Sequence, residues 1–193
     1  MIVDERLPAQ VDAILLYDGD QRHAIAADWL ASGRCNAILL PRRLPDRNQT
    51  LGILEPFDVY SRQTLIQLGV PENAIETLDN HDQFGEWKYV RLLRTWLEQH
   101  PEATAVVFCD RFHSRETRYA IRHVLPANQR HRVQVYALPS RSYDEQRWWR
   151  SRRGAVDYFN ALIGLMYASC VGEDPDQPLT WNVDDFEWRL GDP

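Results

Sequence analysis

The sequence predicts an α/β fold, with helices on both faces of a doubly wound, mainly parallel sheet of about five strands. Two observations support this fold class. Apolar runs of strand length alternate along the chain with longer segments in which apolar residues recur at helical spacing. Residues that favour turns separate the two kinds of segment. Because crossover helices cover both faces of a parallel sheet, this alternation predicts a three-layer single domain.

The predicted strands are short apolar runs that end at turn-forming or polar residues. Asp18-Gly19-Asp20 ends the first run, and Pro41 ends the second. The fourth run ends in a polar cluster that begins at Asp110, and the fifth alternates apolar with polar residues. The strands are expected at Val11–Tyr17, Asn36–Leu40, Ala74–Leu78, Ala105–Cys109 and Arg132–Leu138.

The predicted helices lie between and after these strands. Gly33 stops the first helix and Gly69 the second, while the polar segment Arg42 to Pro56 has no helical period. The last helix contains the apolar stretch Ala155 to Val171. Because this stretch is short and is interrupted by Asp157, we expect a buried helix and not a membrane span. The helices are expected at Gln21–Ser32, Val59–Leu68, Glu86–Gln99, Ser114–Val124 and about Arg150–Ser169.

Right-handed crossovers give these elements a Rossmann-like strand order, 3-2-1-4-5, in which the first and fourth strands are neighbours. Open sheets of this kind bind ligands at the carboxyl ends of the strands, where the order reverses. The loop from Asp18 to Arg22 would then face the segment from Asp110 to Arg115 across one cleft. We therefore expect a functional site between these two segments.

The polar cluster after the fourth strand carries side chains suited to an anionic ligand. His113 is the candidate acid or base, and Asp110 is the second candidate catalytic residue. Arginine forks suit phosphate, and the nearby helix amides would keep the imidazole neutral. The alternative is structural: His113 packs or caps the helix, and the arginines form a solvated face with Glu116. The candidate ligand-binding residues are Asp18, Gly19, Arg22, Arg111, Arg115 and Arg118.

The sequence identifies no cofactor and no metal. Gly19 is the only glycine in the loop that follows the first strand, so the glycine patterns of dinucleotide and P-loop sites are absent from that loop. Pro41-Arg42-Arg43 follows the second strand, where a ribose-binding protein would place an acid, and this disfavours NAD. Asp18 and Asp20, together with Asp110, would suit a divalent cation; alternatively they serve turns and helix caps.

Composition indicates the class of partner and the compartment. A net charge of −6 disfavours nucleic acid as a partner. Lys88 is the only lysine and the other 21 cations are arginines, which either reflects genome composition or favours an anionic small molecule. The three cysteines lack CxxC spacing, and no signal-peptide pattern opens the chain. We expect a cytoplasmic protein with no membrane span, and the oligomeric state is left open.

The chain divides near residue 171 into a domain, residues 1–171, and an acidic tail, residues 172–193. An acidic segment either lies across a basic face, here the arginine-rich stretch from Arg111 to Arg153, or remains a solvated end. Three large aromatics, Trp181, Phe186 and Trp188, are unusual in a disordered segment. We therefore expect the tail to dock on the domain and to bury Trp181 or Trp188.

Four segments resemble the ElyC/SanA/YdcF family, whose Rossmann-like domain has a poorly defined biochemical role. They are Asp12-Ala13-Ile14-Leu15-Leu16 with Arg22 and Gly33, Leu68 to Ile75, Phe112-His113-Ser114-Arg115, and Arg147 to Gly154. The chain departs from the family pattern in its reduced glycine loop, in Asp110 and Glu116, and in Ala161 and Gly164 on the last helix. The resemblance implies a soluble, divergent member linked to envelope homeostasis. Adenosylmethionine binding, suggested for one member, is disfavoured here by Arg42 and Arg43.

Two hypotheses of function follow. In the first, the protein binds a phosphate-bearing or nucleotide-linked metabolite and acts on it as a transferase or hydrolase, with an envelope precursor as the substrate that the resemblance implies. Arg22 and Arg115 would hold the anion and His113 would move a proton. In the second, it is a non-catalytic module that binds an anion or a partner through Trp148, Trp149 and nearby arginines. The structural alternative for the tryptophans is that one packs on the sheet and one covers its edge.

Overall fold

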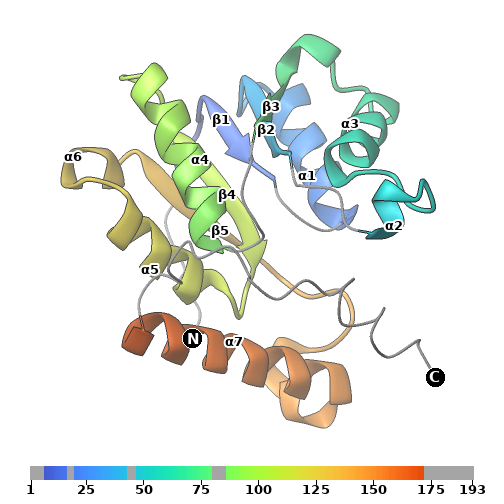
Figure 1. The fold of residues 1–193 in the computed structure, drawn as a ribbon, viewed down its shortest axis with the longest axis vertical. Helices are drawn as coiled ribbons and strands as arrows, with labels where there is room; N and C mark the ends of the chain where they lie inside the picture. Colours follow the sequence, from blue (N-terminus) through green and yellow to red (C-terminus); the bar gives the residue numbers. More distant parts are fainter. Residues whose placement is uncertain (1–6, 17–19, 43–46, 80–85, 172–193) are drawn as a thin grey trace, which may run out of the picture.

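A computed structural model of the protein describes residues 7–16, 20–42, 47–79 and 86–171. It confirms the predicted fold class. Five strands form one open sheet in the order β3-β2-β1-β4-β5, and all of its strand pairs are parallel (Figure 1). The predicted pairing of the first and fourth strands is also confirmed, with Ile14 of β1 opposite Val106 of β4. The strands are β1 (Ala13–Leu15), β2 (Ala37–Pro41), β3 (Ile75–Leu78), β4 (Ala105–Asp110) and β5 (Val133–Leu138).

The long helices lie close to their predicted positions. Gly33 follows α1 and Gly69 follows α3 with φ angles of 71° and 88°, a left-handed conformation that favours glycine and ends both helices. The segment from Arg42 to Pro56, predicted to lack regular structure, contains the short helix α2. The long helices are α1 (Asp20–Ala31), α3 (Phe57–Gln67), α4 (Glu86–Gln99), α5 (Ser114–Val124) and α7 (Arg152–Val171). The short ones are α2 (Arg47–Thr50), α6 (Ala127–Arg130), η1 (Glu72–Ala74) and η2 (Glu145–Arg150).

Each face of the sheet has its own apolar core, because alternate strand residues point to opposite faces. In β4, Val107 and Cys109 belong to the core formed with α4 and α5, whereas Val106 and Phe108 belong to the core formed with α1 and α3. Both faces of the central strands are therefore buried, and polar groups can leave the sheet only where strands end. Polar side chains of the central strands therefore lie at their ends, and those at the carboxyl ends of β1 and β4 include Asp110.

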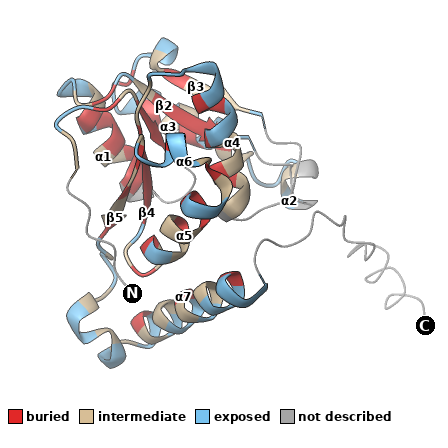
Figure 2. Cartoon of the chain, turned by 90° about the vertical axis from the view of Figure 1, so that its left-hand side faces the viewer, coloured by how far each residue is buried: buried red, intermediate tan, exposed pale blue. Residues whose placement is uncertain are grey.

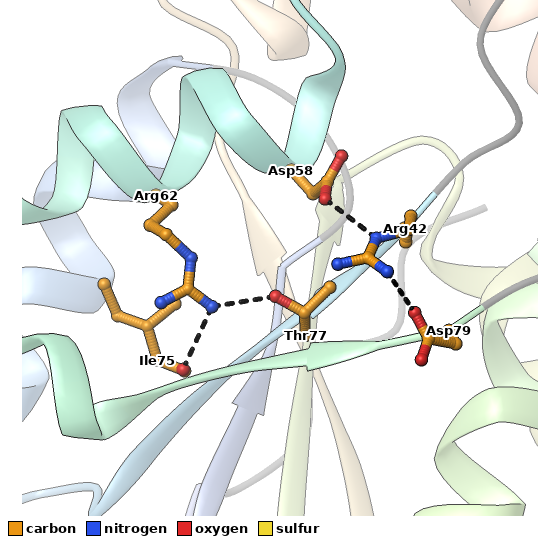
Figure 3. A network of polar contacts seen from close by, with 6 residues as sticks. All are labelled: Arg42, Asp58, Arg62, Ile75, Thr77 and Asp79. Atoms are coloured by element: carbon orange, nitrogen blue, oxygen red, sulfur yellow. Dashed lines mark hydrogen bonds and ion pairs between the residues drawn. The ribbon is translucent and has the colours of Figure 1, made fainter.

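A network of arginines ties α3 to the edge of the sheet (Figure 3). Arg62 of α3 donates to the Thr77 hydroxyl at 2.8 Å and to the Ile75 carbonyl at 3.4 Å. Arg42, just after β2, pairs with Asp58 of α3 at 3.2 Å and with Asp79 after β3 at 2.7 Å. Arg42, which stands after β2 where a ribose-binding protein would have an acid, thus connects the end of β2 to α3 and to the segment after β3.

Helix α7 departs from the prediction that it is buried. Its buried residues are Gly154, Ala161 and Ala168, all of them small, and most of its large apolar residues are exposed (Figure 2). The prediction was wrong because apolar composition favours burial in general but does not say which neighbour covers a helix. Among the described residues, α7 is the one helix long and apolar enough to cross a membrane. One helix of this length and composition is weak evidence, so this property alone assigns no membrane span.

Candidate functional site

A cavity of about 550 Å³ opens at the carboxyl ends of β4 and β5. Its wall comprises the end of β4 with the turn after it, the loop that follows β5, and the first turns of α7. Arg22, from the helix after β1, completes the lining. The cavity therefore lies at the edge of the sheet where the sequence predicted a site, and extends from there toward β5 and α7.

The ion pair between Arg22 and Asp110 joins the two segments that the sequence predicted to converge. The Arg22 guanidinium lies 2.9 Å from the Asp110 carboxylate. The Arg22 side chain is 4% exposed and that of Asp110 is 54% exposed, so the pair runs from the protein interior to the cavity surface. Asp110 thus compensates the charge of a buried guanidinium, which is a structural task additional to any role in chemistry.

A second ion pair positions the loop after β5. The Arg111 guanidinium, just past β4, lies 3.1 Å from the Glu145 carboxylate. The other Glu145 oxygen accepts a hydrogen bond from the Ser140 backbone N–H at 2.6 Å. Glu145 therefore links the turn after β4 to the loop after β5, and Arg111 faces the cavity with its charge already compensated.

His113 lines the cavity, and its ring is oriented by a carboxylate. Nδ1 of His113 lies 3.2 Å from the Glu116 carboxylate, three residues further along α5. The Glu116 carboxylate also lies against Gly164 of α7, where an added Cβ would be 2.8 Å from one of its oxygens. An imidazole held through Nδ1 in this way is a suitable proton acceptor or donor.

Arg115 and Arg118, the other predicted ligand-binding residues that the structure describes, lie outside the cavity wall. Arg115 is exposed on α5 and is not part of the cavity wall. Arg118 donates from Nη1 to the Val133 carbonyl at 3.0 Å and so ties α5 to the start of β5. Asp18 and Gly19 lie outside the described residues. The structure thus brings Arg22, Asp110, Arg111 and His113 together, and it does not bring Arg115 or Arg118 to them.

The sequence reasoning missed the polar cavity residues that come after β5, which are Ser140, Arg141, Ser142, Tyr143, Glu145, Arg153 and Asp157. Burial raises the pKa of the Tyr143 phenol, and its hydrogen bond with Asp157 raises the pKa further, so the phenol remains protonated. The Tyr143 ring also stacks on Phe112, with 6.0 Å between centroids. These residues lie in a loop and at a helix start, where no period or motif marks them. The one available signal was the density of arginines after β5.

Trp148 and Trp149 lie in η2, directly before the N-terminus of α7. The Trp148 ring stacks on Tyr158 of α7 at 3.9 Å between centroids, and Trp149 is 61% exposed. Neither the position of Trp148 nor that of Trp149 matches the structural alternative, in which one packs on the sheet and one covers its edge. Trp148 instead fixes η2 to α7, and Trp149 is available to solvent.

No group of three or more His, Cys, Asp or Glu side chains in the described part of the chain is placed to hold a metal ion. The side chains of Asp18 and Asp20 lie outside the described part of the structure. A divalent cation held by these two residues and Asp110 therefore stays a prediction. Cys35 and Cys109 are both buried, and neither lines the cavity.

Comparisons with protein-family models, with curated proteins and with solved structures found no match. The resemblance to the ElyC/SanA/YdcF family therefore stays a prediction from sequence.

Proposed function

We propose that the protein binds a phosphate-bearing or nucleotide-linked small molecule in the cavity at the carboxyl edge of the sheet. The observation that carries this proposal is the pairing pattern of the arginines. Arg22 and Arg111 are compensated by carboxylates, whereas Arg141 and Arg153 are exposed at the same cavity and pair with no carboxylate among the described residues. These two guanidiniums are available to an anionic ligand.

The charge balance of the cavity supports an anion. Four arginines and three carboxylates line it, which gives +1 with His113 neutral, although the whole chain carries −6. Guanidinium forks bind phosphate oxygens in pairs, and hydrogen bonds to charged groups contribute about 1.5–3 kcal/mol each. A volume of about 550 Å³ has room for a nucleotide-sized molecule.

The chemistry that best fits the wall is proton transfer at a bound phosphate ester or diphosphate. Glu116 orients His113, so the imidazole would deprotonate an attacking hydroxyl or water, or protonate a leaving group. This is the chemistry of a transferase or hydrolase. An envelope precursor as substrate is a further proposal that depends on the family resemblance.

The test of binding uses inorganic pyrophosphate and uridine diphosphate as probes in titration calorimetry. Arg141→Ala and Arg153→Ala should each weaken binding about tenfold or more, the loss of one charge-assisted contact. Arg122→Ala, which removes an exposed arginine of α5 outside the cavity wall, is the matched control and should leave the affinity unchanged. The proposal fails if neither probe binds, or if the control weakens binding as much as Arg153→Ala does.

Arg115→Ala separates the sequence hypothesis from the geometry of the cavity. The sequence predicted that Arg115 holds the anion. If it does, Arg115→Ala should weaken probe binding as much as Arg153→Ala does. Because Arg115 lies outside the cavity wall, we expect Arg115→Ala to bind both probes with unchanged affinity.

The second hypothesis, a non-catalytic module, keeps one observation in its favour. Trp149 is exposed among the exposed arginines Arg147 and Arg150, and tryptophan with arginine is a preferred pair in binding surfaces. A turnover screen with phosphate esters, with and without Mg²⁺, distinguishes the two. Turnover that is lost in His113→Ala while probe affinity is kept supports the enzyme, and tight binding without turnover supports the module.

A further inference from the structure

The outer face of α7 carries more exposed large apolar side chains than any other described helix. Val156, Phe159, Ile163 and Met166 follow one another at spacings of three and four residues, so they form one continuous stripe. The opposite side of α7 packs against α5 (Figure 2). Ile163, at the centre of the stripe, is 63% exposed, so the described part of the chain leaves this stripe open to solvent.

The N-terminal end of the same helix is strongly basic. Arg147, Arg150, Arg152 and Arg153 are all exposed there. A segment that covers the whole stripe must therefore be apolar along α7 and acidic near Arg150 and Arg152. These two requirements restrict the occupant.

Residues 172–193 meet both requirements. Six large apolar residues occur in this tail in two alternating sets, at positions 179, 181 and 183 and at positions 186, 188 and 190. In an extended segment alternate residues point to the same side, so Leu179, Trp181 and Val183 form an apolar side that can face α7, and the second set begins only after Asp184 and Asp185. The intervening residues include Asp184, Asp185 and Glu187, which are acidic.

The length and attachment point of the tail fit as well. The tail begins directly after Val171, where α7 ends. A helix of 20 residues is about 30 Å long. An extended return along it needs about nine residues at roughly 3.3 Å each. After a turn of about four residues, such a return brings Asp184 and Asp185 to the arginine end of α7.

We propose that the tail, residues 172–193, folds back along α7 and covers its apolar stripe, with the carboxylates of Asp184, Asp185 and Glu187 facing the guanidiniums of Arg150 and Arg152. Attachment to α7 gives the tail a high effective concentration at this face, which favours it over a second copy or a membrane surface. The proposal is independent of the ligand proposed for the cavity.

Photo-cross-linking in the full chain identifies the occupant directly. Ile163→p-benzoylphenylalanine places the reactive ketone at the centre of the stripe, and mass spectrometry of the digested product locates the adduct. The expected product is a cross-link within one chain to a peptide from residues 172–193. A covalent dimer, an adduct with lipid when phosphatidylglycerol vesicles are added, or no adduct to the tail after complete photolysis would each overturn the proposal.

The matched control places the same reactive residue at Ile66 of α3, which is exposed and lies on the other face of the sheet from α5. Ile66→p-benzoylphenylalanine should give no adduct with the tail. A tail adduct of similar yield at both positions would show a segment without a fixed docking site and would also overturn the proposal.

Charge reversal tests the register of the tail on α7. Arg150→Glu combined with Arg152→Glu should lower the yield of the tail adduct at residue 163 by about fivefold or more, and about 0.5 M NaCl should act in the same direction. Arg94→Glu combined with Arg122→Glu reverses two exposed arginines on other helices and should leave the yield unchanged. An unchanged yield after reversal at Arg150 and Arg152, in a protein with wild-type melting temperature, would refute the facing of carboxylates and arginines.

Discussion

The buried guanidinium of Arg22 makes Asp110 a stabilising residue as well as a candidate for chemistry. Asp110→Ala should lower the free energy of unfolding by about 1–2 kcal/mol, because it removes a charge-assisted hydrogen bond from a buried cation. The value lies at the low end for a buried pair since Asp110 itself is half-exposed. Urea denaturation measures the loss.

Asp79→Ala is the control for Asp110→Ala. Its carboxylate pairs with Arg42, and both of these side chains are more than half exposed. Pairs of this kind contribute about 0–1 kcal/mol. If Asp110→Ala and Asp79→Ala lowered the free energy of unfolding equally, burial of Arg22 would not explain the strength of the Arg22–Asp110 ion pair.

The raised pKa of the buried Cys35 thiol predicts a loss of stability at alkaline pH. Burial raises the pKa of the Cys35 thiol from 9.0 to about 11, while Arg34 opposes this shift. The neutral thiol is favoured in the folded state, so its contribution is complete below pH 9 and is lost as the pH rises toward 11. Between pH 7.5 and 10.5, wild type should lose about 2 kcal/mol more than Cys35→Ala. Parallel pH profiles of the two proteins in urea denaturation would contradict this.

Sequence reasoning reached the residues that the sheet itself positions. His113 and Arg111 follow β4 directly, and Arg22 lies in the first turns after β1, so strand order alone places them at one edge. Arg141 and Arg153 depend instead on the path of the loop after β5 and of η2, which no local pattern specifies. Arg118 lies outside this group, because its guanidinium donates to the Val133 carbonyl, a partner that no local sequence pattern indicates.

Helix α7 is positioned by a close approach that only glycine allows. A Cβ on Gly154 would lie 2.6 Å from the Trp148 carbonyl oxygen and 2.9 Å from the Tyr143 ring. Gly154→Ala should therefore destabilise the protein by about 1–3 kcal/mol, because the backbone of η2 must move. Thermal unfolding followed by near-UV circular dichroism, which reports on the stacked Trp148 and Tyr158, measures the effect.

Gly164→Ala provides the contrast on the same helix. Its new methyl group would meet the carboxylate of Glu116, which is a flexible side chain able to rotate away. Alanine also gains up to about 1 kcal/mol in helix propensity over glycine, so stability should change little. If Gly164→Ala were as destabilising as Gly154→Ala, the distinction between a backbone and a side-chain neighbour would be wrong.

The elements differ in how far their surroundings could be predicted. The bounds of α4 and α5 agree with the sequence prediction, because each helix has an apolar stripe that packs on the sheet. The apolar residues of α7 predicted burial as well, yet α7 contacts α5 and has only Gly154, Ala161 and Ala168 buried. Period and composition define a helix and its faces, whereas the neighbour that covers each face is a tertiary property.

The molecule combines a rigid sheet with a peripheral helix that completes the cavity. β1 and β4 are hydrogen-bonded on both edges and buried on both faces, so their amides should exchange with solvent most slowly. α7 has few buried side chains and should exchange at a lower free energy of opening. Because Arg153 and Asp157 bring α7 into the cavity wall, binding at the cavity should act on this less stable element.

Hydrogen exchange with and without pyrophosphate tests this coupling. Pyrophosphate at saturation should slow the exchange of amides in the first turns of α7, residues 152–157, by about tenfold or more, since a ligand held by Arg153 must be released before that turn opens. Amides of α3, on the opposite face of the sheet, should change less. In Arg153→Ala the added protection of α7 should disappear. If pyrophosphate protected α3 as strongly as α7, the ligand would stabilise the fold as a whole and α7 would have no special part in holding it.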